Sequence, residues 1–176
     1  MEYWDVLDSN RNKTGKVILR GDTFGENEYH LIVHVWIKNS KNEIVISKRK
    51  KDKYPYPGLW ECTGGSAVSG DDSLKTALKE VKEELGIDLN QEKGKIVYQY
   101  KGNNGFSPHF VDVWVFNQEV DKETIKCQET EVEKAKIASV EEILKLLNEN
   151  KFVPDCRLYI DKIINYRRNL THASTL

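Results

Sequence analysis

Three glutamates near the middle of the chain have the spacing of a carboxylate cluster. On an α-helix, at ~100° per residue, Glu83 and Glu84 fall within roughly 60° of Glu80 around the axis. Like charges on one helix face repel each other unless water or a cation screens them. Because hard divalent cations such as Mg²⁺ prefer carboxylate oxygens, this spacing indicates a metal site.

A solvated helix face is the alternative explanation for these glutamates. Lys75, Lys79 and Lys82 are interleaved with them and could balance their charge. For an arbitrary helix this alternative is favoured, so the carboxylates need support from the surrounding sequence.

A glycine-rich segment, residues 64–71, precedes the glutamates. Gly64, Gly65 and Gly70 supply flexible backbone just before the predicted helix. Free amides and the helix macrodipole at such a position can receive anionic oxygens. The segment is weak evidence alone and gains weight from the glutamates that follow it.

The glutamates need a helix to position them, and residues 71–85 predict one. Its apolar residues recur at intervals of three and four, and Gly86 ends it. The candidate N-terminal caps are Asp71, Asp72 and Ser73.

Strands predicted on both sides of this helix provide a sheet. We expect an N-terminal hairpin from residues 3–7 and 16–19, and a second hairpin from residues 30–37 and 43–48. Residues 54–60 contain two prolines and predict a loop near a binding site. Further strands are expected at 95–101, 110–116 and 135–138, and further helices at 140–149 and 155–168. This order predicts an α/β sandwich with a mixed sheet.

Composition excludes several classes of protein. The chain has 176 residues, which suits one domain, and 27 Lys and Arg against 28 Asp and Glu give a net charge of -1. No global basic field therefore attracts nucleic acid or a membrane surface. No stretch is long and apolar enough to span a membrane. Three widely separated cysteines predict a reducing, cytoplasmic compartment.

Residues 65–87 resemble the Nudix box, G-x5-E-x7-R-E-U-x-E-E-x-G-U, in which U is aliphatic. The matching positions and their spacing are Gly65, five residues, Asp71, seven residues, and then the run from Lys79 to Ile87. Asp71 replaces a glutamate of the family and Lys79 replaces an arginine. A lysine does not reproduce the planar fork of that arginine, which orients a neighbouring carboxylate in the family.

The resemblance implies a fold, a metal site and a reaction. It implies a single Nudix-type α/β/α sandwich over residues 1–176, with an added N-terminal β-hairpin (1–25), the box (65–87) and a C-terminal helix (154–170). Glu80, Glu83 and Glu84, with the Gly64 carbonyl, would hold Mg²⁺ or Mn²⁺. The implied enzyme is a pyrophosphatase that cleaves a nucleoside diphosphate linked to another moiety or a related small diphosphate. Glu80 or Glu83 is the expected base for water attack.

Several residues outside the glutamates are candidates for substrate contact. Arg49 is the preferred phosphate ligand, with Lys48 beside it. We expect the Gly65 backbone, Tyr56 and Glu131 to meet substrate as well. Glu129 and Glu133 compete with Glu131 for a place in the site, and ordinary surface charge is the favoured outcome for each.

Two histidines on the predicted strand 30–37 lie on the same face of that strand. A hydrogen-bonded structural role is the favoured interpretation for His30 and His34. His30 falls where a related enzyme, type 1 isopentenyl diphosphate isomerase, has a metal-binding histidine, so it is also a candidate for a second metal or substrate contact.

That isomerase is the main rival function. The chain is similar to it through Tyr29 to Leu31, Val35 to Ile37 and Pro57 to Trp60. Its catalytic cysteine, however, falls at Gly65, and Cys62 lies three residues earlier and should point elsewhere. Its second catalytic glutamate falls near residues 108–110, which contain no carboxylate. Hydrolysis is therefore preferred.

A Nudix-like module that binds nucleotides without catalysis is the third alternative. Retention of all three glutamates argues against it. The expected partner is a small-molecule diphosphate, and the N-terminal hairpin and last helix are candidate surfaces for a homodimer.

Overall fold

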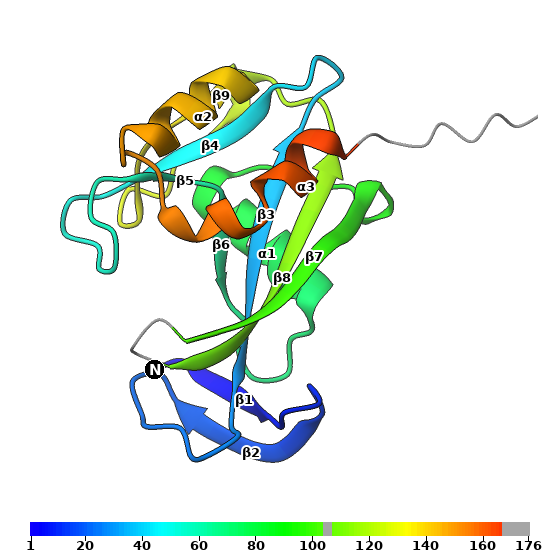
Figure 1. Cartoon of the computed structure of the whole chain (residues 1–176), viewed down its shortest axis with the longest axis vertical. Helices are drawn as coiled ribbons and strands as arrows, with labels where there is room; N and C mark the ends of the chain where they lie inside the picture. The colour runs from blue at the N-terminus through cyan, green and yellow to red at the C-terminus, as the bar shows by residue number, and fades with distance from the viewer. Residues whose placement is uncertain (104–106, 167–176) are drawn as a thin grey trace, which may run out of the picture.

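The computed structural model describes residues 1–103 and 107–166, and its centre is a mixed sheet (Figure 1). Strands β3 (His30–Lys38) and β8 (Pro108–Asn117) lie side by side in parallel, and β7 (Gly94–Asn103) pairs antiparallel with β8. The strands on the other side of β3 are antiparallel: β4 (Ile44–Arg49), β5 (Trp60–Glu61), β6 (Thr63–Ser66) and β9 (Val132–Ala138).

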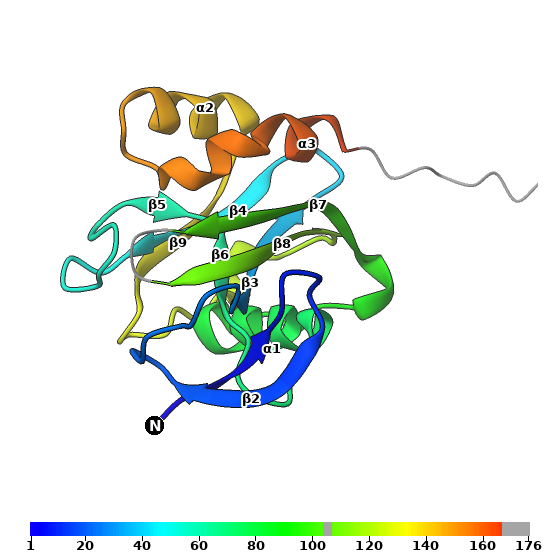
Figure 2. The ribbon, with the colours of Figure 1, turned by 60° about the horizontal axis from the view of Figure 1, so that its bottom comes forward.

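Helices cover both faces of this sheet. Figure 2 shows α1 (Ser73–Leu85) below it, and α2 (Val140–Asn148) and α3 (Ile160–Asn165) above it. Alternation along β3 explains the two layers, because Val33, Val35 and Ile37 pack with α1 whereas Trp36 packs with the other two helices. The predicted α/β/α sandwich with a mixed sheet is confirmed.

The N-terminal segment forms a separate two-stranded sheet. Strands β1 (Tyr3–Leu7) and β2 (Lys13–Leu19) pair antiparallel, and a bridge between Leu7 and Tyr29 joins them to the start of β3. Trp4, Val6 and Ile18 bury a small apolar cluster of their own. Figure 1 shows this hairpin at the opposite end of the molecule from α2.

Two expectations about local structure were wrong. Residues 64–66, expected to be a flexible loop, form strand β6 and pair with β3 from Ile32 to Val35. The expected long C-terminal helix begins as a 3₁₀ turn (Pro154–Leu158), and Tyr159 with φ of -143° separates that turn from the short α3. The expected helix residues beyond 166 lie outside the described part.

Candidate active site

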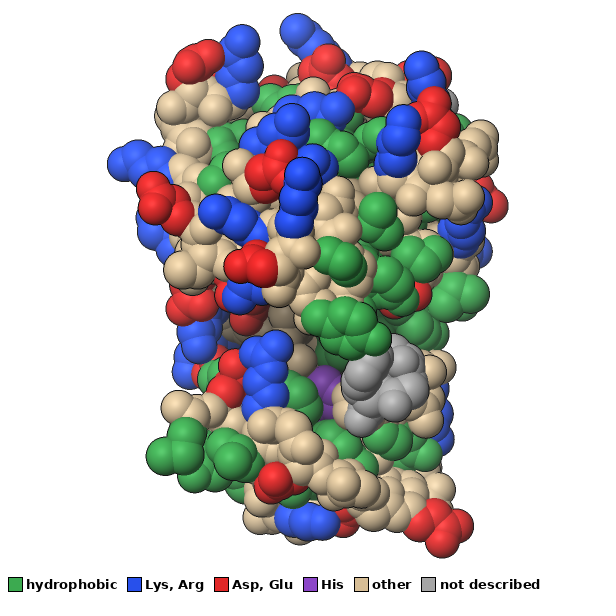
Figure 3. Space-filling view, turned by 90° about the vertical axis from the view of Figure 1, so that its left-hand side faces the viewer, with side chains coloured by type: hydrophobic (Ala, Val, Ile, Leu, Met, Phe, Trp, Pro, Cys, Tyr) green, Lys and Arg blue, Asp and Glu red, His purple; other side chains and the backbone are tan. Residues whose placement is uncertain are grey.

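A cavity of about 830 Å³ lies where the hairpin, β3, β6 and α1 meet the loop before β5. Figure 3 shows a hollow on this side of the molecule, between the lower part of the view and the sandwich above it. Its volume falls within the range of small-molecule sites. Nearly all of the residues that the sequence singled out lie around it.

The three glutamates of α1 all line the cavity, but they differ in burial. Glu83 is exposed, whereas Glu80 and Glu84 are partly buried. Burial and the neighbouring Glu83 raise the pKa of Glu80 to about 7. Burial, with the charges of Glu61 and Glu80, raises the pKa of Glu84 well above its ordinary value, and Glu84 Oε2 has no hydrogen-bond partner. An extra positive charge at this place would relieve the clustered carboxylates.

Both ends of α1 are fixed by residues of the box. Among the three candidate caps the structure selects Asp72, whose side chain accepts a hydrogen bond from the Lys75 amide. Gly86 ends the helix with φ of 69°, in the left-handed region that favours glycine. The helix is therefore held so that its glutamate face is turned to the cavity.

The two substituted positions of the motif contact each other. Asp71 is only 7% exposed, and its carboxylate lies 2.5 Å from Lys75 Nζ and 3.9 Å from Lys79 Nζ. Lys79 thus faces a carboxylate on the loop before the helix, and its charge also lowers the pKa of the adjacent Glu80 against the effect of burial. Asp71 and Lys79, which replace the glutamate and the arginine of the motif, therefore still form an ion pair, but a lysine cannot make the bidentate contact of an arginine.

Two glycines allow β6 to approach both β3 and α1. A Cβ atom on Gly64 would lie 2.2 Å from the Val33 carbonyl oxygen, and one on Gly65 would lie 2.4 Å from the Glu80 carboxyl group. The sequence suggested that these glycines give flexibility, whereas the structure uses their small size. Glu80 can pack against the strand because Gly65 has no side chain.

Glu61 is a cavity residue that the sequence analysis missed. It lies on β5 beside β4, and its two carboxylate oxygens accept hydrogen bonds from Arg49 Nη1 at 3.0 and 3.1 Å. Burial raises the pKa of Glu61 to about 7, although Arg49 opposes that shift. The expected phosphate ligand Arg49 is therefore already paired with a carboxylate. No local sequence pattern marks Glu61, because its strand β5 (Trp60–Glu61) is only two residues long.

The other expected substrate contacts divide into two groups. Tyr56, Gly65 and Glu131 line the cavity, and so does Lys53, whose Nζ lies 2.6 Å from Glu131. Lys48 is not among the lining residues, and its Nζ binds Glu133 at 3.0 Å. Because alternate residues of a strand point to opposite faces, Lys48 cannot accompany Arg49 into the cavity.

His30 and His34 line the cavity as neutral, hydrogen-bonded side chains. His30 Nε2 lies 2.9 Å from Ser107 Oγ, and its ring stacks on Trp4 at 4.2 Å. His34 Nδ1 lies 2.7 Å from the Tyr159 hydroxyl. Burial lowers the pKa of His30 to about 3 and that of His34 to about 4. These contacts support the structural interpretation of both rings.

The N-terminal hairpin forms a wall of the cavity. Glu2, Trp4 and Arg20 line it, and Arg20 Nη1 binds Glu2 at 3.0 Å. The sequence predicted only an accessory to the sheet, because nothing in residues 1–25 indicates which side of the sheet the hairpin covers.

Comparison with known proteins identifies the family. The model of the NUDIX domain matches residues 28–156. The chain is a member of the Nudix family. It is 35% identical over 177 residues to a Listeria monocytogenes protein named as an uncharacterized Nudix hydrolase, with 100% of this chain and 99% of that protein covered. The crystal structure of DR0079 from Deinococcus radiodurans superposes with a TM-score of 0.73 at 17% identity, covering 94% of this chain and 100% of that one.

A Nudix protein of different activity is also similar. Isopentenyl-diphosphate Delta-isomerase 1 of Photorhabdus laumondii is 30% identical over 102 residues, 57% of each chain. This supports the expected relation to the isomerase branch. Residues 1–27 lie outside the matched Nudix domain, although they contribute Glu2, Trp4 and Arg20 to the cavity.

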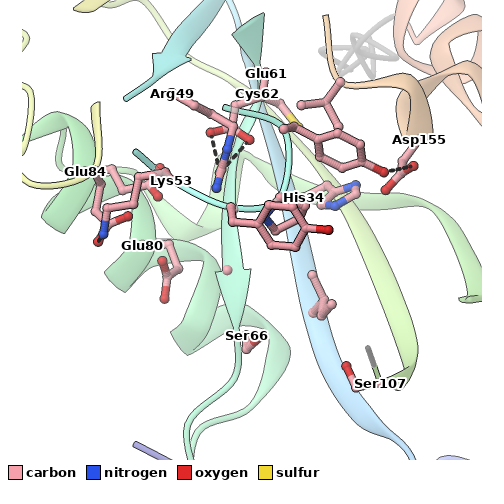
Figure 4. A pocket seen from close by; sticks show the side chains of 18 of the residues that line it. His34, Arg49, Lys53, Glu61, Cys62, Ser66, Glu80, Glu84, Ser107 and Asp155 are labelled. Atoms are coloured by element: carbon pink, nitrogen blue, oxygen red, sulfur yellow. Dashed lines mark hydrogen bonds and ion pairs between the residues drawn. The ribbon is translucent and has the colours of Figure 1, made fainter. Parts of the chain in front are cut away.

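Cys62 corrects one expectation about the isomerase comparison. It was expected to point away from the site, but it lines the cavity (Figure 4). Burial raises the pKa of its thiol well above the ordinary value, so the thiol stays neutral.

No helix within the described residues is long and apolar enough to cross a membrane.

The donor atoms of the Nudix box determine which kind of cation the cavity could hold. Among residues 1–103 and 107–166 no three His, Cys, Asp or Glu side chains converge closely enough to form a ready-made metal site. The donor chemistry nevertheless fits a hard divalent cation, since Glu80 and Glu84 are clustered carboxylates and Glu84 Oε2 is buried without a partner.

Proposed function

We propose that this Nudix hydrolase cleaves the pyrophosphate bond of a nucleoside diphosphate linked to another moiety, or of a related small diphosphate, with Mg²⁺ or Mn²⁺. The observation that carries the proposal is the cavity lined by all three box glutamates, where Glu84 Oε2 is buried without a hydrogen-bond partner. Ionised carboxylates clustered in this way destabilise the folded chain unless a cation binds among them, and such clusters are typical of functional sites.

Glu80, Glu83 and Glu84 would hold the metal, together with the carbonyl group of Gly64. When bound, the divalent ion supplies charge neutralisation for the diphosphate and polarises its phosphorus. Glu83 is exposed and remains accessible to a water molecule, while Glu80 has a pKa of about 7 and can accept a proton near neutral pH. We assign general-base function to one of these two carboxylates.

Cations around the cavity would contact the phosphate oxygens. Arg49 and Lys53 line the same cavity as the carboxylates, and each is already paired with a glutamate. An incoming diphosphate can share these cations through charge-assisted hydrogen bonds. Arg49 keeps its expected role of substrate contact in this proposal, and Lys48 is left out.

The unpaired state of all three cysteines supports our expectation of a reducing, cytoplasmic compartment.

A substrate screen tests the proposal. Wild-type protein is incubated with Mg²⁺ or Mn²⁺ and with nucleotide sugars, dinucleotides, coenzyme A and nucleoside triphosphates, and phosphorus-containing products are quantified. Glu83→Gln should reduce hydrolysis by roughly 100-fold or more. Glu92→Gln is the control, because Glu92 is exposed and is not among the residues that line the cavity, and it should leave hydrolysis unchanged. No turnover with any substrate, in the presence of binding, would favour a non-catalytic module.

Isomerisation is the second candidate function, favoured by the similarity to the isomerase. Isopentenyl diphosphate is included in the screen, with the product analysed for a moved double bond. Cys62 lies in the cavity as a neutral thiol, but no carboxylate occupies residues 108–110. Conversion of isopentenyl diphosphate without release of phosphate would replace the hydrolase proposal.

A further inference from the structure

The cavity has two ends with different chemistry. Figure 4 shows Glu80, Glu84 and Lys53 on one side, and His34 and Asp155 on the other. We call the second side the aromatic end and define it by five lining residues: His34, Tyr56, Phe152, Asp155 and Tyr159. None of these residues belongs to the Nudix box.

A rigid aromatic wall forms one side of the aromatic end. Tyr159 is 1% exposed, and its ring centroid lies 5.8 Å from that of His34 and 6.1 Å from that of Tyr100. The hydrogen bond between the Tyr159 hydroxyl and His34 Nδ1, at 2.7 Å, fixes both rings. A wall held in this way is ordered before any ligand arrives, which lowers the entropy cost of binding.

The side chains of this wall are uncharged at neutral pH. Burial lowers the pKa of His34 to about 4, and it raises the pKa of Tyr159 well above its ordinary value. Burial also raises the pKa of the nearby Cys156 thiol to about 12. Asp155 supplies a carboxylate at this end, so a second phosphate group is disfavoured here while a hydrogen-bond donor is favoured.

Tyr56 closes the aromatic end from the proline-containing loop. Its backbone has φ of 63°, a conformation that non-glycine residues rarely adopt. Its hydroxyl donates a hydrogen bond to Asp155 Oδ1 at 3.1 Å, across 99 positions of sequence. The loop and the segment before α3 are thereby joined over the cavity, with a partly buried ring positioned beside a carboxylate.

We propose that the aromatic end binds the base of a nucleotide substrate, with the base stacked on Tyr56 and its N–H groups donating to Asp155. This inference rests on the proposed function, because the diphosphate must lie at the glutamate end. Adenine and guanine both offer planar faces and N–H donors, and stacking of a base on an aromatic side chain is sequence-tolerant.

A hydrocarbon chain fits the aromatic end less well. It would bury the Asp155 carboxylate without supplying a hydrogen-bond donor to it. A base supplies N–H donors to that carboxylate and still covers the partly exposed ring of Tyr56. The isoprenoid substrate of the related isomerase is therefore not the ligand that this end favours.

Binding of monophosphates tests the inference without turnover, since they contain no pyrophosphate bond. AMP, GMP, methyl phosphate and geranyl monophosphate are titrated into the protein in the presence of Mg²⁺ by isothermal titration calorimetry. AMP and GMP should bind at least about 10-fold more tightly than methyl phosphate. Tyr56→Leu and Asp155→Asn should each remove most of this difference, while methyl phosphate affinity stays the same.

Tyr56→Phe is the matched control, because it keeps the ring and loses only the hydroxyl. It should retain most of the preference for nucleotides. If Tyr56→Leu fails to fold, Asp155→Asn makes the same comparison. Equal affinity for AMP and methyl phosphate, or tighter binding of geranyl monophosphate, would overturn the inference. Absence of hydrolysis in the substrate screen would count instead against the proposed function.

Discussion

The Arg49 guanidinium donates from one nitrogen to both carboxylate oxygens of Glu61, at 3.0 and 3.1 Å. Both side chains are about one-fifth exposed, with 20% of Arg49 and 18% of Glu61 accessible to solvent. Glu84 and Glu131 interact electrostatically with this pair. Besides burial, the charges of Glu61 and Glu131 raise the pKa of Glu84, and the charge of Glu131 also raises the pKa of Glu61. Arg49 thus offsets the charge of Glu61 and part of the charge of Glu84, while Lys53 pairs with Glu131.

Removal of Arg49 should destabilise the fold. Arg49→Ala leaves Glu61 buried without its cation, a change that costs roughly 2–4 kcal/mol for a largely buried pair. The measurement is the free energy of unfolding in urea at pH 7.5. The double variant Arg49→Met with Glu61→Leu should recover much of the loss, since it removes both charges.

Lys48→Ala is the matched control on the same strand. Lys48 pairs with Glu133 outside the cavity, so its removal should cost much less than removal of Arg49. Equal losses for the two variants would show that Arg49 does not have the special role assigned to it.

Neutralisation of Glu84 should stabilise the metal-free protein. Burial raises the pKa of Glu84 above its unfolded value, so ionisation opposes folding as the pH rises above the ordinary pKa of 4.5. Glu84→Gln should therefore unfold at higher urea concentration than the wild type at pH 8 in EDTA. An unchanged or lower midpoint for Glu84→Gln under these conditions would contradict the buried-charge explanation.

The same variant should lose its response to metal. A ligand that binds only the folded state raises the free energy of unfolding. Addition of Mg²⁺ or Mn²⁺ should raise the melting temperature of the wild type and have a smaller effect on Glu84→Gln. The melting temperatures are measured by differential scanning calorimetry in calcium-free buffer. An equal rise in melting temperature for both proteins would remove Glu84 from the proposed metal site.

The two neighbouring glycines of β6 should respond differently to alanine. At Gly64 the added Cβ would meet the Val33 carbonyl oxygen at 2.2 Å, and two paired backbones cannot separate locally without loss of hydrogen bonds. At Gly65 it would meet the end of the Glu80 side chain at 2.4 Å, which can rotate away. Gly64→Ala should therefore lower stability by about 2 kcal/mol or more.

Gly65→Ala should mainly affect catalysis, because it displaces Glu80 while leaving the strand paired. We expect a loss of hydrolysis of at least about 10-fold with a smaller loss of stability than for Gly64→Ala. Unfolding in urea and the rate with the best substrate of the screen are measured on the same preparations. Full activity in Gly65→Ala would contradict the importance of the observed Glu80 position.

The helix and most strands were predictable because local periodicity determines them. Leu74, Val81 and Leu85 have the helical repeat, and Val33, Val35 and Ile37 have the strand repeat, so the layers on both sides of β3 follow from the sequence. The Nudix spacing likewise predicted which glutamates line the cavity.

Contacts between distant segments were not predictable in the same way. Glu61 pairs with Arg49 through β4–β5 pairing, and Tyr56 reaches Asp155 across the cavity, so neither contact has a local sequence pattern. The strand at Gly64 and Gly65 was missed because glycine disfavours strands on average, while here close packing requires it. The last helix was overestimated because the apolar pattern continues through Tyr159, where the backbone leaves the helical region.

Acid should destabilise the protein through His34. Burial lowers its pKa to about 4 in the folded state against 6.5 ordinarily, so the unfolded chain binds more protons below pH 6.5. The stability contributed by neutral His34 is complete above pH 6.5 and is lost progressively as the pH falls toward 4. Between pH 7 and pH 5 this loss amounts to about 2 kcal/mol.

His34→Gln isolates this contribution, since glutamine can still bond to the Tyr159 hydroxyl but does not titrate. The other buried histidines, His30 and His109, and the buried glutamates remain in both proteins, so the difference between the two pH profiles belongs to position 34. The free energy of unfolding of the variant should fall less steeply from pH 7 to pH 5 than that of the wild type. Parallel profiles would mean that His34 becomes protonated in the folded protein without cost, against the burial that the structure shows.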